Sequence, residues 1–213
     1  FRVVIMDEVA TSFAVGSDVD ELHEFMLDDF LREPSLNAAI NLTREDATQC
    51  YRDVIEHCVA SGVSTIQRNS EGRVVGFNLS AIVDHGEEED WKSPTRIQLI
   101  LDLLDALNEN KWALIPADVS KLLYVEVVSV GEKYRKRGLA QKLLDLSYEK
   151  AREVGATGSF AECTSFPSQN LFAKTGYRVL REIRLEEFVG NEGKPVFMCP
   201  DGTTSAQLVF RRI

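Results

Sequence analysis

A short basic segment in the second half of the chain has the composition of a phosphate-binding loop. It follows a β-branched run and reads Tyr134-Arg-Lys-Arg-Gly-Leu-Ala140, ahead of a helical pattern. The first backbone N–H groups of a helix have no intrahelical partner, and the helix dipole adds partial positive charge there. Glycine also lets a ligand approach the backbone closely. We therefore expect the segment from Arg135 to Ala140 to bind a pyrophosphate at the start of a helix.

Glu33 is a second residue whose type and position suggest chemistry. It stands directly before Pro34 and follows the apolar residues Phe30 and Leu31. The residue before a proline is pushed out of helical geometry, so a helix should end here. A carboxylate that is partly desolvated has a raised pKa, which suits a general base. A solvated residue at a helix end is the alternative that the sequence leaves open.

Other common sites have no sequence signature in this chain. It contains neither G-x-x-x-x-G-K-[ST] nor G-x-G-x-x-G, and its cysteines and histidines show no metal-ligand spacing. Cys50 and Cys58 are separated by about 12 Å of helical rise, more than the roughly 7 Å that a disulfide allows. We expect all four cysteines to be reduced and no metal to be bound. Cys163 stays open as a nucleophile, because a histidine could approach it in space.

Composition limits the class of protein. The chain has 213 residues, of which 44% are hydrophobic and 27% charged, so we expect one buried core and a single domain over residues 1–213. A formal charge of −10 argues against a nucleic-acid partner and is compatible with a cationic substrate, although a solvated acidic surface also explains it. No apolar run approaches the roughly 18 residues of a membrane span, and we expect a cytoplasmic protein.

The elements that must position these residues form an α/β pattern. Strands are predicted at about 2–6, 63–67, 74–83, 122–130, 158–163, 177–184 and 206–211. Helices are predicted between Ser17 and Pro34, from Thr43 to Ser61, from Ser93 onward, and at 136–154 and 168–174. An early antiparallel hairpin and a later strand-helix-strand unit predict a mixed, mostly antiparallel sheet flanked by helices.

The basic segment and its flanks resemble the core of a known family. A strand, then Arg135-x-x-Gly138-x-Ala140, then a helix, a strand, a helix and the pair Gly176-Tyr177 are similar to the acyl-CoA-binding core of the GNAT acetyltransferases. The resemblance implies the GNAT acyl-CoA N-acyltransferase fold, with acetyl-CoA as cosubstrate. It implies cofactor contacts at Val128, Val130, Arg135, Lys136, Arg137, Gly138, Leu139 and Ala140. The strand before the loop is expected to splay from its neighbour, so that N–H groups near Val128 can bind the oxyanion.

Two further segments resemble the insect-type arylalkylamine N-acetyltransferases. Residues 30–37, FLREPSLN, are similar to F-x-x-D-E-P-L-N, and residues 162–170, ECTSFPSQN, are similar to C-S-S-x-x-S. The first match implies that Glu33 is the general base, often acting through water, since an arylalkylammonium with a pKa of roughly 10 must lose a proton before it attacks. The second implies catalytic roles for Thr164 and Ser168, with helix capping as the alternative. Arg32 and Ser35 depart from the family pattern.

These observations predict an enzyme that transfers acetyl from acetyl-CoA to the primary amine of a small arylalkylamine, such as dopamine, serotonin, tyramine or octopamine, by direct sequential attack. One alternative is a GNAT that acts on polyamines, amino acids or protein N-termini, and the acidic loop from Glu87 to Asp90 would suit a polycation. The other is a non-catalytic acyl-CoA-binding module that keeps the phosphate loop but lacks a working base.

Overall fold

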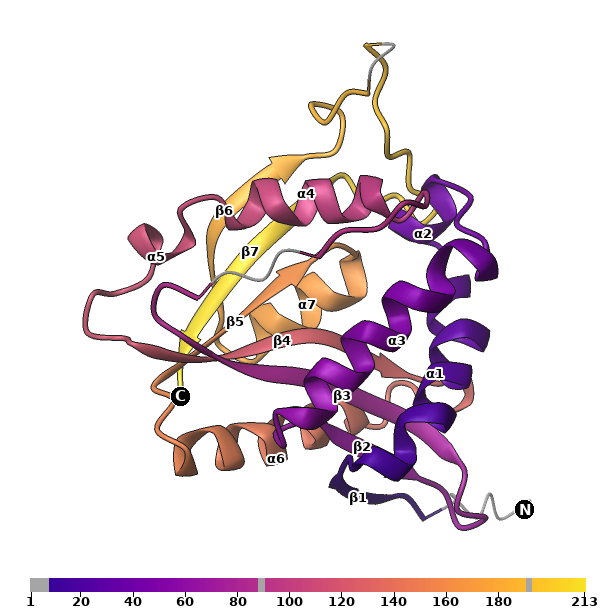
Figure 1. The fold of residues 1–213 in the computed structure, drawn as a ribbon, viewed down its shortest axis with the longest axis vertical. Helices are drawn as coiled ribbons and strands as arrows, with labels where there is room; N and C mark the ends of the chain where they lie inside the picture. Colours follow the sequence, from indigo (N-terminus) through magenta and orange to yellow (C-terminus); the bar gives the residue numbers. More distant parts are fainter. Residues whose placement is uncertain (1–7, 88–90, 191–192) are drawn as a thin grey trace, which may run out of the picture.

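A seven-stranded mixed sheet forms the centre of the molecule, with helices on both faces (Figure 1). The computed structural model describes residues 8–87, 91–190 and 193–213. The strands lie in the order β1-β2-β3-β4-β5-β7-β6. Their bounds are β1 Ala10–Phe13, β2 Thr65–Arg68, β3 Val74–Asp84, β4 Lys121–Val130, β5 Gly158–Cys163, β6 Arg178–Arg184 and β7 Ser205–Arg212. Among these strands β4 and β5 are parallel and the other neighbours antiparallel, which confirms the predicted mixed, mostly antiparallel sheet.

The helices divide between the two faces of the sheet. Their bounds are η1 Gly16–Asp18, α1 Val19–Asp28, η2 Phe30–Arg32, α2 Leu36–Ala39, α3 Arg44–Ala60, α4 Gln98–Asn108, α5 Lys111–Leu114, η3 Glu132–Tyr134, α6 Leu139–Glu153 and α7 Phe166–Lys174. Figure 1 shows α1, α3 and α4 over one face and α6 with α7 over the other. Phe77 packs on the α1 and α3 side, whereas Leu123 and Val125 pack against α6 and α7.

Most helices and strands lie where the local sequence patterns predicted them. The hydrogen bonds at the start of α3 confirm one predicted helix start. The Thr43 side chain accepts a hydrogen bond from the Asp46 N–H, and the Asp46 carboxylate accepts one from the Thr43 N–H, so this pair begins α3 as predicted. The predicted cap at Ser17 is wrong. The Asp18 N–H donates to the Val15 carbonyl at 2.8 Å and closes a 3-10 turn before α1, and the Asp18 carboxylate accepts a hydrogen bond from the Val15 N–H at 2.8 Å.

Other boundaries differ from the prediction for identifiable reasons. Helix α4 begins at Gln98 instead of Ser93, because the Ser93 N–H donates to the Gln98 side chain at 2.7 Å. Helix α6 begins at Leu139 instead of Lys136, since Lys136 and Gly138 have φ values of 60° and 72°. The strand predicted at 2–6 lies outside the described residues, and β1 was not predicted.

The parallel strands β4 and β5 run together for only part of their length. Their pairing ends at Val125↔Ala161, although β4 continues to Val130. On its other side β4 stays paired with β3, and the register shift between Leu79↔Val127 and Ser80↔Val125 makes Glu126 the extra residue of a β-bulge. A bulge bends a strand and increases its twist. The bulge therefore lies where β4 leaves β5, as the sequence analysis expected for the strand before the basic loop.

Gly158 sets how closely β4, β5 and β7 approach each other. A Cβ at this position would lie 2.6 Å from the Phe210 ring and 2.9 Å from a methyl of Leu122. Both side chains are buried, with exposed fractions of 2% and 0%, so neither can move aside. We predict that Gly158→Ala lowers the free energy of unfolding by about 1–3 kcal/mol in urea denaturation. The control is Gly16→Ala, where a Cβ meets open space. Equal stability of the two variants would contradict this account.

Candidate active site

The edge of β4 that faces the gap presents backbone groups without a strand partner. The Gly131 N–H donates to the Val75 carbonyl at 2.9 Å, and Gly76 stands opposite Val130 in the register. In two antiparallel strands, opposed residues alternate between hydrogen-bonded and non-hydrogen-bonded pairs. Val130 is therefore in a non-hydrogen-bonded pair, and so is Val128, two residues before it. Their N–H and C=O groups therefore point away from β3 and toward the side where β5 has diverged. Both residues were predicted to contact the cofactor.

The basic segment forms a tight loop between β4 and α6. After η3 it passes through Lys136 and Gly138, both with left-handed φ values. The Lys142 N–H makes the first turn's bond to the Gly138 carbonyl at 3.2 Å, so the amides of Leu139 and Ala140 precede the helical hydrogen bonds. A Cβ on Gly138 would meet open space, and its left-handed φ is therefore what requires glycine. The loop thus offers the geometry of a phosphate cradle.

The predicted cradle residues contribute in different ways. The Leu139 side chain is buried against Val130 and Leu143, which leaves only its backbone for a ligand. Arg137 stacks over the Tyr134 ring with 5.4 Å between the guanidinium carbon and the ring centroid. Lys136 is exposed, and Ala140 is partly exposed. Cationic side chains and amides that precede the helical hydrogen bonds lie on one loop, and this combination fits the phosphates of a CoA ester.

Arg135 connects this loop to the distant Glu33. Its Nε donates to the Val130 carbonyl at 2.8 Å, and its Nη2 lies 2.7 Å from Glu33 Oε1. Glu33 follows η2 in extended geometry before Pro34, as the proline predicts. The structure therefore brings together two residues that are 102 positions apart in the chain.

The environment of Glu33 shifts its protonation equilibrium. Its side chain is 21% exposed. Desolvation by burial raises the pKa of Glu33, Arg135 lowers it, and the carboxylates of Asp29 and Asp201 raise it further, with a net upward shift. A base with a raised pKa binds a proton more readily near neutral pH. Three carboxylates at this place also create a negative potential that attracts a cation.

A loop before β7 links Glu33 to the start of α7. The Asp201 N–H donates to the Pro34 carbonyl at 3.1 Å, and the Asp201 carboxylate accepts from the Thr203 hydroxyl at 2.8 Å. Thr203 Oγ1 in turn accepts from the Phe166 N–H at 3.2 Å. This chain of hydrogen bonds places Glu33 and the segment 164–168 on either side of one loop.

Ser168 and Thr164 occupy different surroundings. The N-cap of α7 is Ser165, whereas the sequence suggested Ser168 as the capping residue. Ser168 is its reciprocal partner and donates from Oγ to the Ser165 carbonyl at 2.9 Å. Thr164 follows β5 and is partly exposed, and its side chain makes no hydrogen bond within the described residues. Its hydroxyl is therefore available to a ligand, whereas Ser168 would have to exchange a capping bond.

Several other candidates from the sequence have structural roles. Burial raises the pKa of the Cys163 thiol far above its usual range, so this thiol is not an activated nucleophile. All four cysteines are free, as expected. The Tyr177 hydroxyl donates to Ser159 Oγ at 2.6 Å and shares a hydrogen bond with Tyr148 of α6, which supports packing over acid catalysis. Within the described ranges no three His, Cys, Asp or Glu side chains form a metal-binding group, and no helix could cross a membrane.

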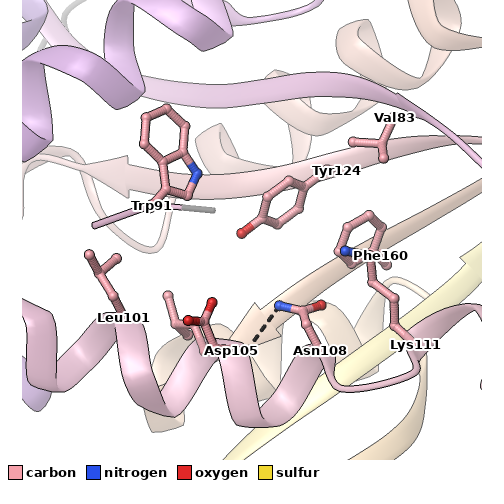
Figure 2. A pocket seen from close by; sticks show the side chains of 9 residues that line it. Val83, Trp91, Leu101, Asp105, Asn108, Lys111, Tyr124 and Phe160 are labelled. Carbon is pink, nitrogen blue, oxygen red and sulfur yellow. Dashed lines mark hydrogen bonds between the residues drawn. The ribbon is translucent and has the colours of Figure 1, made fainter. Parts of the chain in front are cut away.

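A small cavity lies between α4 and the sheet, before the point where β4 leaves β5 (Figure 2). Its volume is about 40 Å³. The lining residues are Val83, Trp91, Leu101, Leu104, Asp105, Asn108, Lys111, Tyr124 and Phe160. The Tyr124 and Phe160 rings stack with centroids 4.5 Å apart and an angle of 7° between their planes. Glu162 lies next to this cavity, because it accepts a hydrogen bond from the Asn108 amide.

Comparison with known proteins agrees with this geometry. The model of the acetyltransferase (GNAT) family matches residues 22–177, which is most of the chain. The chain belongs to the GNAT family. GNAT acetyltransferases use acetyl-CoA as cosubstrate and transfer its acetyl group to an acceptor, so the loop from Arg135 to Ala140 has a ligand that fits it.

Several solved structures share the fold across nearly the whole chain. Arylalkylamine N-acetyltransferase 2 from Aedes aegypti is 21% identical, with a TM-score of 0.86 over 97% of this chain and 99% of that one. The Drosophila melanogaster polyamine N-acetyltransferase, which forms N-acetylagmatine, is 19% identical, with a TM-score of 0.80 over 97% and 100%. The C-terminal condensation domain of Ebony, solved with β-alanyl-dopamine, is 17% identical, with a TM-score of 0.79 over 98% and 100%. These likenesses establish the fold and leave the acceptor open.

Three residues near Glu33 were not predicted from the sequence. Asp29 and Asp201 act on the Glu33 pKa, and Tyr51 of α3 is a buried phenol whose own pKa is raised by burial and by nearby groups that include Glu33. The residues Pro200-Asp-Gly202 are typical of a turn and indicate the loop before β7. They give no reason to expect that this loop contacts Pro34. Tyr51 has the spacing of an ordinary core residue in a helix, so its hydroxyl gave no separate signal.

The ion pair between Arg135 and Glu33 gives a direct test of the site's electrostatics. We predict that Arg135→Gln moves the carboxyl pKa of Glu33 to still higher pH, because the variant removes the cation that opposes desolvation. The measurement is the carbon-13 chemical shift of the Glu33 carboxyl against pH in the ligand-free protein. Lys136→Gln is the matched control, since it removes a neighbouring charge of the same loop. A shift of equal size in both variants would show that general loop charge, and not this pair, sets the pKa.

Proposed function

We propose that this GNAT transfers an acetyl group from acetyl-CoA to the primary amine of a small arylalkylamine by direct sequential attack. The observation that carries the proposal is the position of Glu33, a half-buried carboxylate with a raised pKa that is held by an arginine of the phosphate loop. A base for the amine and the cradle for the cofactor thus meet at one point. We also propose a cytoplasmic location, which agrees with four free thiols.

The chemistry assigned to Glu33 is proton removal. An arylalkylammonium is almost fully protonated at neutral pH, and only its neutral form attacks a thioester. Glu33, directly or through water, accepts the proton that the amine loses. The new C–N bond then forms at the thioester carbonyl as the C–S bond breaks, and the CoA sulfur leaves with a proton from solvent or from a hydroxyl group.

The other residues of the site have supporting roles in this proposal. The Val128 N–H points into the gap between β4 and β5 and can donate to the oxyanion of the tetrahedral intermediate. The Leu139 and Ala140 amides, with Lys136 and Arg137, bind the pyrophosphate. The Thr164 hydroxyl, directly after β5, makes no hydrogen bond within the described residues, which favours Thr164 over Ser168 as the proton donor to sulfur. Ser168 acts in this scheme only after it releases its bond to Ser165.

The walls of the α4 cavity favour an aromatic acceptor. Three rings, Trp91, Tyr124 and Phe160, line it on the face of the sheet where Glu126 and Val127 of the bulge also lie. Aromatic side chains give flat, apolar surfaces, and the cavity that they line can take the far end of an aromatic acceptor whose ring lies outside it. The fold shared with an arylalkylamine acetyltransferase supports the same choice.

A polyamine or a guanidinium amine is the second candidate. Asp29 and Asp201 add negative charge around Glu33, and Asp105 adds it at the cavity. A solved enzyme with the same fold acetylates agmatine. A panel of tryptamine, dopamine, spermidine, agmatine and a lysine peptide, compared by kcat/KM, separates the two candidates. Acetyl-CoA binding without turnover of any amine would indicate the non-catalytic module.

We predict that Glu33→Ala lowers kcat/KM for the preferred amine by about 10²–10⁴, because the variant removes the general base. Binding of acetyl-CoA, measured by calorimetry, should change little, since the cradle amides remain. Glu153→Ala is the control, because it removes an exposed carboxylate at the opposite end of α6 from the cradle. Unchanged turnover in Glu33→Ala would show that Glu33 is not the general base.

A further inference from the structure

The α4 cavity holds an unusual polar group within its aromatic walls. Asn108 Nδ2 donates to the Leu104 carbonyl at 3.0 Å and to the Glu162 carboxylate. Both donors of the amide are therefore engaged, and this fixes its orientation. Asn108 Oδ1 is buried and has no hydrogen-bond partner within the described residues. A buried acceptor without a protein partner is unfavourable unless a water molecule or a ligand supplies the donor.

The size of the cavity restricts which part of a ligand can enter it. About 40 Å³ accommodates a group of the size of a water molecule or a hydroxyl, and not a whole aromatic ring. The cavity is therefore suited to the far end of an acceptor whose ring lies nearer to the gap between β4 and β5.

The position of the cavity fits such an end group. Tyr124 lies four residues before Val128 on β4, a separation of at most roughly 13 Å at the rise of an extended strand. The bulge at Glu126 shortens this path. The distance between Val128 and the cavity therefore suits an acceptor whose amine lies at the thioester. The ring of this acceptor and its substituent would point toward α4.

The charges around the cavity decide between a neutral and a cationic end group. Lys111 is buried, and its Nζ lies 5.4 Å from the centroid of the Phe160 ring, beside Asn108 in the lining (Figure 2). Asp105 is paired with Lys92 at 2.9 Å. The carboxylate of Glu162 already interacts with Asn108, Tyr124 and Lys111. A second ammonium or guanidinium would therefore meet a resident cation and carboxylates that already have partners.

We infer that Asn108 and Lys111 are specificity-determining residues: Asn108 Oδ1 accepts a hydrogen bond from a hydroxyl on the acceptor's ring, and Lys111 excludes acceptors with a second positive charge. This inference rests on the proposed amine acetyltransferase function and goes further, because it selects ring-hydroxylated monoamines over both unsubstituted arylalkylamines and polyamines.

The test compares tyramine with phenethylamine, which differ only in the ring hydroxyl, and agmatine as the dication. We expect wild-type kcat/KM for tyramine to exceed that for phenethylamine by roughly 10-fold to 100-fold. Asn108→Leu should reduce this ratio to about 3-fold or less by lowering the tyramine value alone. Asp102→Leu, on the exposed face of α4, is the matched control and should keep the wild-type ratio.

The variant Lys111→Met gives a second, independent test, because methionine has a side chain of similar length without the charge. We expect it to raise the agmatine-to-tyramine ratio of kcat/KM by about 10-fold, because the resident cation is gone. Equal wild-type rates for tyramine and phenethylamine, or a ratio that survives Asn108→Leu in a folded variant, would overturn the role of Asn108. An unchanged agmatine ratio in Lys111→Met would overturn the role of Lys111. Turnover of agmatine with neither arylalkylamine would instead reject the proposed function itself.

Discussion

The separation of β4 from β5 is the constraint on which the rest of the site depends. One strand has to remain hydrogen-bonded to β3 while its other edge is left open, and the bulge at Glu126 achieves this by bending β4 at the last paired residues. Helix α6 then begins beyond the open edge, so its free amides lie at the end of the same gap. Continued pairing of β5 along β4 would occupy the backbone groups of Val128 and Val130 and leave no room for a thioester.

The two halves of the site come from opposite ends of the chain and are joined by polar contacts. Arg135 contacts both the end of β4 and Glu33, and Asp201 holds Pro34 while its partner Thr203 accepts from the first residue of α7. These bonds fix Glu33 relative to the basic loop through side chains and loop amides. Because Arg135 is also a cradle residue, any ligand charge placed on the loop acts on Glu33 through this pair.

Most of the fold could be predicted from the sequence because its signals are local. The β-branched runs of β3 and β4 and the capping pair at Thr43 and Asp46 need only their immediate neighbours. The site was predicted in part, through the resemblance of three short segments. The Asp201 bridge, the Arg135–Glu33 pair and the α4 cavity depend on contacts between residues far apart in sequence, and residue patterns carry no signal for them. Short elements such as β1, α2 and α5 were missed because four residues contain too few positions for a period.

The raised pKa of Glu33 also has a consequence for the evolution of this chain. A carboxyl whose pKa is higher in the folded state than in the unfolded state stabilises the fold when protonated, and this contribution is lost as pH rises through the folded-state value. Once it is ionised, the Glu33 carboxylate therefore weakens the fold. Selection for stability alone would favour an uncharged residue at position 33, so the carboxylate at this position indicates selection for a property other than stability.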